Sequence, residues 1–590
     1  MAPRLLLCGA IRPYGTDAPL DERQLGLGRR EVERLGLRAW LGRRVTSAEA
    51  HTNAILSNFA RGDPQPIVLH TRNPGPAFIA YNLAADATVA EWLSLGELLR
   101  LIAAERPAFV GISSLTQEFP KVELMVTAIR SAFPDVRIVL GGYGVVTPQI
   151  ERLAGQVFAV TREEGVAFFR RLLGEDQARP YRNPPLRISP RMSLLGIPLP
   201  VPLRRLLHFD PVFTALGLGC RMRCRFCATS NYWEGYRPLL PSGREAYASM
   251  RELARALGSP QPFFWVNEDD FLDHHERNVE ILRLNERHGT TAAIGCFSSA
   301  RAIQEYAPED LVKLGVDTVF VSLESTRPSA VYNPRKKIDG RGRSIDFAAL
   351  VATLQEHGVS VFVSTMFGLP GNDFADNLAD MEHALALAPT AWQWSVMTPY
   401  PGTPLYEELA RTGRLLHPEV ARPDGDGGRW VEFDGMTPQV RLEGVVPEQL
   451  SWLIREAPRR AYLQGGPTLL GRVGVALRGW RTFRRTGDSL LRALAARRAE
   501  LCSRALPLLL AYQDRELGLD ASLREQALDL GRRIVVEVRG ARRPTLVDRA
   551  AAEIIRLCAR RQDDARLRAA LSPGRGVVNR SRGPWQWSES

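Results

Sequence analysis

The stretch Cys220-Arg221-Met222-Arg223-Cys224-Arg225-Phe226-Cys227 holds three of the seven cysteines in this 590-residue chain. Three thiolates in a Cys-x3-Cys-x2-Cys loop can wrap a cubane iron–sulfur cluster and leave its fourth iron without a cysteine. An open position on a catalytic metal can bind a small ligand. The alternatives are a structural zinc or iron–sulfur knot, or three unrelated cysteines. A closed structural site needs a fourth ligand, and no fourth cysteine lies nearby.

The apolar run before this loop, residues 212–219, predicts a buried strand that ends in glycine. The cysteines then follow a strand, which is where α/β barrels keep their chemistry. Five more strand patterns follow, separated by helical patterns, at residues 262–267, 291–297, 317–323, 359–367 and 391–398. Six strand–helix units predict a partial barrel over residues 206–436, open on one side.

The cysteine loop resembles the signature of the radical S-adenosylmethionine (SAM) superfamily, in which an aromatic residue, here Phe226, precedes the last cysteine. The resemblance implies a [4Fe-4S] cluster on Cys220, Cys224 and Cys227. It also implies that the open iron chelates the amino and carboxylate groups of SAM, and that an electron comes from a flavodoxin or ferredoxin.

Polar residues at the predicted strand ends fit the same resemblance. It places Glu268 at the SAM amino group, and it places Ser298 and Arg301 at the SAM carboxylate or the cluster. The remaining positions are Ser322 and Glu324 at the ribose and Gly368 at the adenine. The alternatives are that Glu268 is a cluster ligand or general base and that Glu324 is a structural carboxylate. We expect Cys296 in the core and the pair His274 and His275 on the surface.

Residues 1–175 alternate between strand and helix patterns, which predicts a parallel, doubly wound, Rossmann-like sheet. Expected strands include residues 5–8, 67–70, 77–81, 108–114, 136–144 and 157–160, and expected helices include 89–104 and 120–133. Ligands bind outside the carboxyl ends of such strands. There Ser113 and Ser114 offer hydroxyls, and Gly141 and Gly142 allow a large flat ligand to approach the backbone.

The pattern Gly111-Ile112-Ser113-Ser114, followed by Val139-Leu140-Gly141-Gly142, resembles the cobalamin-binding domain that precedes many radical SAM barrels. Many such domains carry a histidine after the first strand that coordinates the cobalt. The loop Gly9-Ala10-Ile11-Arg12-Pro13-Tyr14-Gly15 has none, so we expect no protein histidine on the lower face of a bound cobalamin. A sheet without cofactor is the alternative. Residues 19–63 form an insertion with helical periodicity at 30–41, and surface extension is favoured over a cap on the cofactor.

Composition bounds the remaining possibilities. The net charge is +12, and residues 451–590 contain 28 Arg against 14 Asp plus Glu, so the basic surplus lies in the C-terminal part. Few cysteines and a thiolate-bound cluster indicate a reducing compartment, and we expect the cytoplasm. The N-terminal apolar run is too short for a signal peptide. No run reaches the roughly 18 apolar residues of a membrane span.

Three further segments complete the expected organisation: a Pro- and Arg-rich linker at 176–205, a basic helical domain at 437–571 and a disordered tail at 572–590. A solvated helical cap is the favoured interpretation of the basic domain. An acidic partner or peripheral contact with an anionic membrane is the alternative. Aromatic residues are not interleaved with the arginines, which argues against nucleic acid.

Together these features predict a cobalamin-dependent radical SAM methyltransferase that acts on an unactivated carbon of a small molecule. By resemblance, one SAM methylates the cobalt and a second is cleaved to a 5'-deoxyadenosyl radical. That radical takes a hydrogen atom from the substrate, and the resulting carbon radical captures the methyl group. The alternatives are a cyclase, rearrangement or oxidation enzyme with the same cofactors, a lipid-modifying methylase, and a non-catalytic iron–sulfur protein. Arg-over-Lys usage fits a GC-rich genome and secondary metabolism, such as antibiotic biosynthesis. Four aromatic residues lie near the barrel mouth: Trp265, Trp392, Trp394 and Tyr400. They indicate an aromatic or heteroaromatic substrate, which could be free or bound to a carrier protein. Simple packing is the equal alternative.

Overall fold

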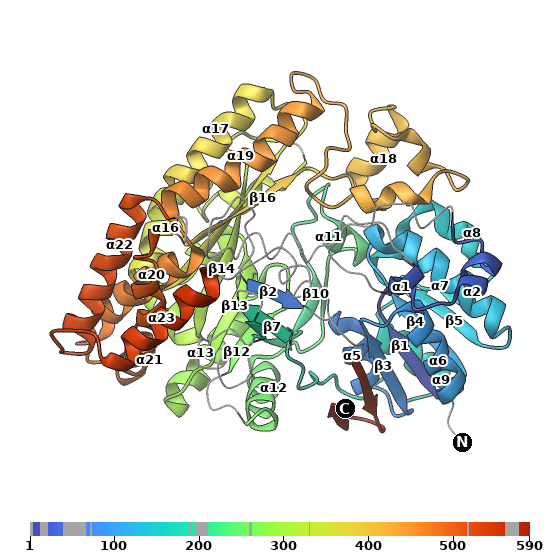
Figure 1. The fold of residues 1–590 in the computed structure, drawn as a ribbon, viewed down its shortest axis with the longest axis horizontal. Helices are drawn as coiled ribbons and strands as arrows, with labels where there is room; N and C mark the ends of the chain where they lie inside the picture. The colour runs from blue at the N-terminus through green and yellow to red at the C-terminus, as the bar shows by residue number, and fades with distance from the viewer. Residues whose placement is uncertain are drawn as a thin grey trace.

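The computed structural model describes residues 4–11, 22–38, 67–70, 73–188, 191–194, 197–198, 211–258, 262–329, 331–515, 519–560 and 577–589. Two sheets organise the chain (Figure 1). An N-terminal sheet lies on one side of the molecule, a larger sheet lies in the middle, and C-terminal helices cover the side of the larger sheet away from the N-terminal sheet.

The N-terminal sheet contains five parallel strands in the order β3-β1-β4-β5-β6. This order confirms the expected parallel, doubly wound sheet. Buried residues on β1 and β4 form the centre of its core, because each of these strands pairs with another strand on both sides. The strands are β1 (Leu5–Cys8), β3 (Ala87–Glu91), β4 (Phe109–Ser113), β5 (Arg137–Gly141) and β6 (Ala159–Val160), and the main helices are α6 (Leu95–Glu105), α7 (Phe119–Ala132) and α9 (Gly165–Leu173).

Two expected elements of this domain are wrong. Residues 77–81 are not a strand but the end of helix α5 (Pro74–Tyr81), because Asn73 caps the helix and Pro74 begins it. Residues 89–91 are strand β3, not helix, and the helix starts later, at a capping box of Ser94 and Glu97. The apolar runs do form regular elements, but the helix caps decide where each helix starts.

Strand β2 (Ile67–His70) exists as expected, but it lies outside the N-terminal sheet. It pairs antiparallel with β7 (Arg191–Leu194), which pairs with β8 (Ile197–Pro198). The expected linker at 176–205 therefore contributes two strands. In the insertion, α1 (Glu22–Leu25) and α2 (Arg29–Arg34) are described, and the rest of the expected helix, beyond residue 38, lies outside the described residues.

The end of the chain is ordered where it is described, contrary to the expected disorder at 572–590. Strand β17 (Val577–Ser581) pairs antiparallel with the outer strand β3, and β18 (Trp587–Glu589) pairs with β17. Both strands lie beside the N-terminal domain (dark red in Figure 1). The Ser581 hydroxyl donates to the carbonyl of Ala80 at 3.1 Å. The free backbone groups of an edge strand provide the template for this pairing, which composition does not reveal.

The larger sheet contains six parallel strands in chain order, β9-β12-β13-β14-β15-β16. Its two edge strands do not pair with each other in the described part of the chain, so the sheet stays open. The strands are β9 (Pro211–Thr214), β12 (Phe263–Val266), β13 (Ala293–Ser298), β14 (Val316–Glu324), β15 (Ser360–Phe367) and β16 (Ala391–Val396); the helices between them are α12 (Gly243–Ala256), α13 (His275–His288), α14 (Ala300–Gln304), α15 (Pro308–Leu314), α16 (Phe347–Glu356) and α17 (Phe374–Ala386).

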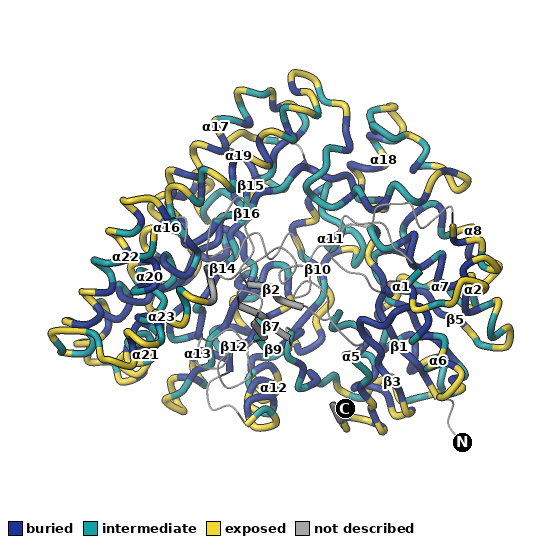
Figure 2. The backbone as a smooth tube through the Cα atoms, in the orientation of Figure 1, coloured by how far each residue is buried: buried dark blue, intermediate teal, exposed yellow. Residues whose placement is uncertain are grey.

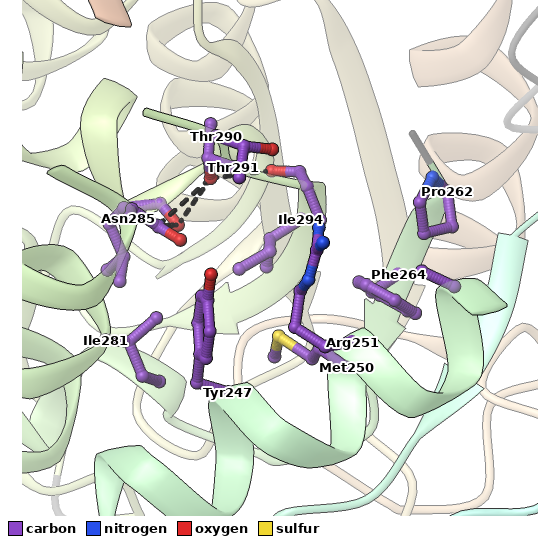
Figure 3. A pocket seen from close by; sticks show the side chains of 13 residues that line it. Tyr247, Met250, Arg251, Pro262, Phe264, Ile281, Asn285, Thr290, Thr291 and Ile294 are labelled. Atoms are coloured by element: carbon purple, nitrogen blue, oxygen red, sulfur yellow. Dashed lines mark hydrogen bonds between the residues drawn. The ribbon is translucent and has the colours of Figure 1, made fainter. Parts of the chain in front are cut away.

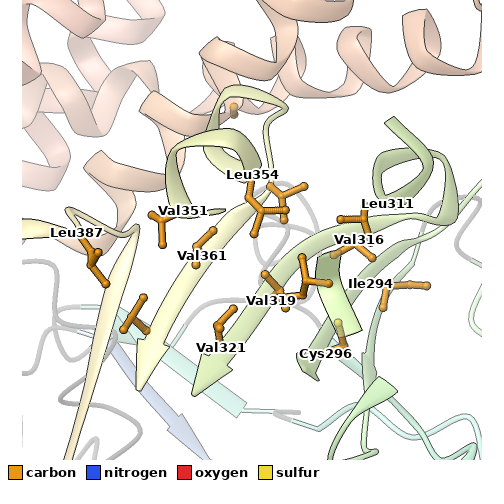
Figure 4. Close-up of a cluster of buried hydrophobic side chains, with 14 of the residues drawn as sticks. Ile294, Cys296, Leu311, Val316, Val319, Val321, Val351, Leu354, Val361 and Leu387 are labelled. Atoms are coloured by element: carbon orange, nitrogen blue, oxygen red, sulfur yellow. The ribbon is translucent and has the colours of Figure 1, made fainter. Parts of the chain in front are cut away.

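Helices cover one face of this sheet (Figure 4). Val319 and Val361 of the sheet belong to one buried cluster with Val351 and Leu354 of α16. Cys296 is fully buried in the same cluster, which agrees with the expected core position, and burial raises the pKa of its thiol. Side chains alternate along a strand, so the residues between these valines point to the opposite, inner face.

The C-terminal helices pack on the outside of the larger sheet, and their outer surfaces are exposed (Figure 2). Several arginines there pair with acidic residues, for example Arg481 with Glu537 at 2.5 Å. Among the described residues, no helix combines the length and apolar character needed to cross a bilayer. The helices are α19 (Pro447–Gly465), α20 (Thr468–Phe483), α21 (Ser489–Ala511), α22 (Ala521–Arg533) and α23 (Leu546–Arg560).

A segment between the sheet and these helices packs on the N-terminal domain. Trp430 is fully buried, and its indole N–H donates to the Gln149 side chain at 2.7 Å. Gln149 in turn donates to the carbonyls of Val420 and Arg422. The expected barrel boundary at residue 436 therefore falls next to a segment that ties the two sheets together.

Candidate functional site: the cysteine loop and the cavity beside it

The cysteine loop lies in a hairpin rather than after one long strand. The expected strand 212–219 divides into β9 and a short β10 (Gly217–Gly219), which turns to pair antiparallel with β11 (Tyr236–Pro238). Gly219 makes the turn possible, since its φ is +78° and a Cβ there would lie 2.0 Å from the carbonyl oxygen of Gly235. Helix α11 (Ala228–Tyr232) begins directly after Cys227.

Two asparagines fix the loop. Asn231 donates to the carbonyls of Cys224 and Cys227 at 2.8 and 2.7 Å. From the long connection after β14, the backbone N–H of Asn333 donates to the Cys224 sulfur at 3.3 Å, and its side chain donates to the Met222 carbonyl at 3.0 Å. Hydrogen bonds to sulfur are a feature of protein iron–sulfur sites. No sequence motif singles out Asn333, although a long polar loop after a strand is a recognisable signal.

The three thiols fit a cluster better than a single ion. No group of three Cys, His, Asp or Glu side chains in the described part of the chain converges on one metal ion. In a four-iron cluster each thiolate binds a different iron, so the sulfurs surround the cluster and need not converge. Burial raises the pKa of Cys220 and Cys224, and iron would lower it again by binding the thiolate form.

The expected residues at the strand ends have different environments. Both carboxylate oxygens of Glu268 accept from Arg277, at 2.9 and 2.6 Å, and one also accepts from the Tyr236 hydroxyl at 2.6 Å. Asp270 accepts from the Ser298 hydroxyl and the Ser299 N–H. Glu268 and Ser298 are thus already engaged within the protein.

Arg301 and Gly368 also contact protein groups. Arg301 donates to Glu305 at 3.0 Å and lies 3.8 Å from Asp273. Gly368 has a φ of +75°, and a Cβ there would lie 3.0 Å from Leu450 of α19. Its N–H donates to Asn377. These contacts give both residues a structural role, and their expected contacts with SAM stay a prediction.

Glu324 lies at the end of β14, and one of its carboxylate oxygens has no hydrogen-bond partner. A bulge in β14 after Ser322 leaves Glu324 at a φ of +59°, a strained conformation for a residue with a side chain. One oxygen accepts from Lys336 at 2.5 Å, and the other is buried without a hydrogen-bond partner. Burial lowers the pKa of Lys336, but Glu324 and Cys224 raise it, so the net shift is upward.

Asp269 is the second group that remains available. Its pKa rises to about 7, because it is buried beside the carboxylates of Glu268 and Asp270, while a bond from the Gly219 backbone opposes the shift. His274, expected on the surface, is instead mostly buried beside Glu268. Burial lowers its pKa to about 4. Its neighbour His275 is exposed, as expected.

An open cavity joins the N-terminal sheet to the cysteine hairpin. On one side it is lined by Ser113, Gly141 and Gly142, where β4 and β5 end in register. On the other side lie Leu218, Trp233 and Asn267, which flank the cysteine loop and the end of β12. No histidine is among the described residues that line it. Ser114 lies behind this surface and packs on Gly144.

Residues 215–384 match the family model described as the radical SAM superfamily. The chain contains a radical SAM domain. This match covers the cysteine loop and the strands from β12 to β15, and it confirms the family expected from the cysteine spacing.

Full-length comparisons are more distant. An uncharacterized methyltransferase of Pyrococcus horikoshii is 24% identical over 412 residues, which cover 64% of this chain and 83% of the relative. The solved radical SAM methyltransferase TsrM of Kitasatospora setae, with tryptophan and a SAM analog bound, is 17% identical with a TM-score of 0.45, over 77% of this chain and 89% of that chain. The cobalamin-dependent enzyme OxsB is 11% identical with a TM-score of 0.45, over 97% and 83% of the two chains. These TM-scores are too low to establish a shared fold.

The three tryptophans expected at the mouth of the radical SAM domain separate into two groups. Trp392 donates to the carbonyl of Ala384, and Trp394 stacks on Phe367 with ring centroids 5.8 Å apart. Both pack against neighbouring elements, so packing is the correct interpretation for these two. Trp265 instead begins a row on the inner face, 5.4 Å from Phe297 and from Phe320.

Proposed function

We propose that this protein is a cobalamin-dependent radical SAM methyltransferase that transfers a methyl group to an unactivated carbon of a small molecule. The observation that supports this most directly is the open cavity between the Ser113–Gly142 edge and the cysteine hairpin. A cofactor there would lie beside the cluster loop, as a shared reaction requires. The name of the P. horikoshii relative agrees with methyl transfer.

The residues fit a large flat cofactor at the N-terminal edge. A Cβ at Gly141 would have no neighbour closer than 3.8 Å, so a larger side chain would extend into the cavity. Gly142 has a φ of +82°, and a Cβ there would lie 2.6 Å from the carbonyl oxygen of Ser114. Ser113 adds a hydroxyl at the same edge. Cobalamin held here would have no histidine from the described lining on its lower face.

The SAM site is proposed on two strand-end carboxylates of the radical SAM domain, those of Glu324 and Asp269. The unpartnered oxygen of Glu324 would accept from a ribose hydroxyl, as buried acceptors need a partner. Asp269 would accept from the amino group, a role we assign to it in preference to Glu268. Cys220, Cys224 and Cys227 would hold the cluster, with Phe226, Ser322, Arg301 and Gly368 around the ligand. When bound, the cluster supplies the electron that cleaves SAM, and cobalamin supplies the methyl group.

The substrate would lie against the inner aromatic row. Trp265, Phe297 and Phe320 are half-buried, and the rings of Phe297 and Phe320 are 5.1 Å apart. Aromatic rings prefer such edge and offset contacts. The row favours an aromatic or heteroaromatic acceptor over a lipid, whether free or attached to a carrier protein. A flavodoxin or ferredoxin would supply the electron.

The test is anaerobic expression with cobalamin, followed by cluster reconstitution and measurement of iron, bound cobalamin, 5'-deoxyadenosine and methylated product from SAM. Gly141→Leu should lose cobalamin but keep iron. Gly155→Leu is the matched control, because Gly155 is exposed and a Cβ there would meet nothing within 4 Å. Cys224→Ala should lose iron and SAM cleavage.

The outcomes separate the alternatives. Product that carries no added methyl group would favour the cyclase, rearrangement or oxidation enzyme, and product formed only from lipid would favour the lipid methylase. A cluster without cobalamin in the wild type, or cobalamin binding unchanged in Gly141→Leu, would overturn the assignment of the cavity.

A further inference from the structure

A second cavity lies at the opposite end of the larger sheet from the cysteine loop. Its walls are the beginnings of β12, β13 and β14, at Phe263, Ala293 and Val316, and helix α21 at Leu494 and Leu501. The cysteine loop and its polar residues follow the strand ends instead. This cavity is therefore separate from the proposed active site, and nothing in the proposed reaction uses it.

Three arginines line this cavity: Arg472 from α20, and Arg497 and Arg498 from α21. The carboxylate that lines it is that of Asp317, which pairs with Arg472 at 2.9 Å. Arg497 donates to the carbonyl of Thr291 at 2.6 Å. The lining thus carries three positive charges against one negative charge.

Arg498 is the unusual member of this set. It makes no hydrogen bond and no ion pair with any described residue, and its Nη1 is buried without a partner. Its guanidinium packs beside Gly358 and Gly479, where a Cβ on either glycine would collide with it. Burial lowers the pKa of Arg498 to about 10, so the side chain is still charged at neutral pH. The charge of Asp317 acts in the opposite direction on this pKa, and the Phe483 ring centroid lies 5.8 Å from the guanidinium carbon, but neither gives Nη1 an acceptor. A buried donor without an acceptor is unfavourable.

A neighbouring cavity gives a useful contrast (Figure 3). It shares Ala292 with the arginine cavity. Its buried amide is satisfied, because Asn285 donates to the Thr291 hydroxyl at 3.0 Å and to the carbonyls of Lys313 and Leu314. Among the described residues that line these two cavities, a buried polar atom without a partner therefore occurs in the arginine cavity and not in its neighbour.

We propose that the arginine cavity binds a small organic oxyanion, with its phosphate or carboxylate group on Arg497 and Arg498 and its apolar body against Val316 and Leu494. Guanidinium groups bind phosphate and carboxylate through paired, charge-assisted hydrogen bonds. The apolar lining residues would exclude water from the rest of the ligand. This site is independent of the proposed function, since it needs neither cluster nor cobalamin.

The test uses the full chain without added cofactors, at constant ionic strength, with binding measured by calorimetry. The probes are phenyl phosphate, benzoate and inorganic phosphate. Phenyl phosphate or benzoate should bind at least about tenfold more tightly than inorganic phosphate, and the tighter of the two identifies the anionic group. Arg498→Met should weaken that binding roughly ten- to a hundredfold, the loss expected for a hydrogen bond to a charged group. Arg549→Met is the control, because Arg549 is exposed on α23, and it should leave binding unchanged.

Thermal unfolding shows whether a variant that does not bind the probes is still stably folded. Without an anion, Arg498→Met should be as stable as the wild type or more stable, because it removes a buried nitrogen that has no hydrogen-bond partner. With phenyl phosphate, only the wild type and Arg549→Met should gain stability. The absence of binding by all three probes to the wild type, equal binding by Arg498→Met, or lower stability of Arg498→Met without ligand would overturn the proposal.

Discussion

Replacing Arg277 with methionine tests whether Glu268 is held by the protein or free to bind a ligand. The Glu268 carboxylate is completely buried and accepts three hydrogen bonds, two of them from Arg277. Arg277→Met removes both charge-assisted bonds and leaves the carboxylate with the Tyr236 hydroxyl as its remaining bonded partner. Breaking a buried ion pair in this way costs about 3–5 kcal/mol.

The assay is urea unfolding of the cluster-free protein followed by circular dichroism, with hydrogen exchange of the β12 and α13 peptides to localise the loss. The double variant Glu268→Leu/Arg277→Met should recover more than half of the loss, because it leaves no charge unpaired. Arg244→Met is the control. Its pair with Glu280 is exposed, and such pairs contribute less than about 1 kcal/mol. A loss for Arg277→Met no larger than that of the control would refute the reasoning and return Glu268 to the list of SAM ligands.

Three further predictions concern the same region. Glu324→Gln should weaken binding of S-adenosylhomocysteine roughly tenfold by calorimetry, the effect of losing a charged acceptor, whereas Glu151→Gln, on the exposed surface of the N-terminal domain, should not. Gly219→Ala should reduce the iron bound after reconstitution, since its Cβ would lie 2.0 Å from the Gly235 oxygen; Gly289→Ala, also at positive φ but with open space around it, should bind normal iron. Burial lowers the pKa of His274 from 6.5 to about 4, so the unfolded state takes up its proton first and stability should fall as the pH drops from about 6.5 towards 4. A urea titration of His274→Asn should lack that part of the fall, and an unchanged pH profile would contradict the assigned pKa.

The sequence predicted the parallel sheets and the cysteine loop well, because apolar runs of strand length and a short metal-binding motif are local signals. Elements decided by caps were less predictable, as at Pro74, where one proline and one asparagine turned an apolar run into a helix. Side-chain partners that lie on different elements were not predictable at all. Arg277 is nine residues from Glu268 but on the next helix, and Lys336 reaches Glu324 from a loop without a recognisable motif. The contacts of these two side chains decided which carboxylates remain available.

The pairing of β17 with β3 also constrains the order of events during synthesis. The strand at residues 87–91 receives its outer neighbour from residues 577–581, so the ribosome must add nearly 500 residues between the two. At roughly 5–20 residues per second, that delay lasts on the order of 25–100 s. Throughout this interval the nascent N-terminal domain presents an unpaired strand edge, while the radical SAM domain and the C-terminal helices emerge and fold. Chaperone protection early in translation would therefore matter more for this domain than for the rest of the chain.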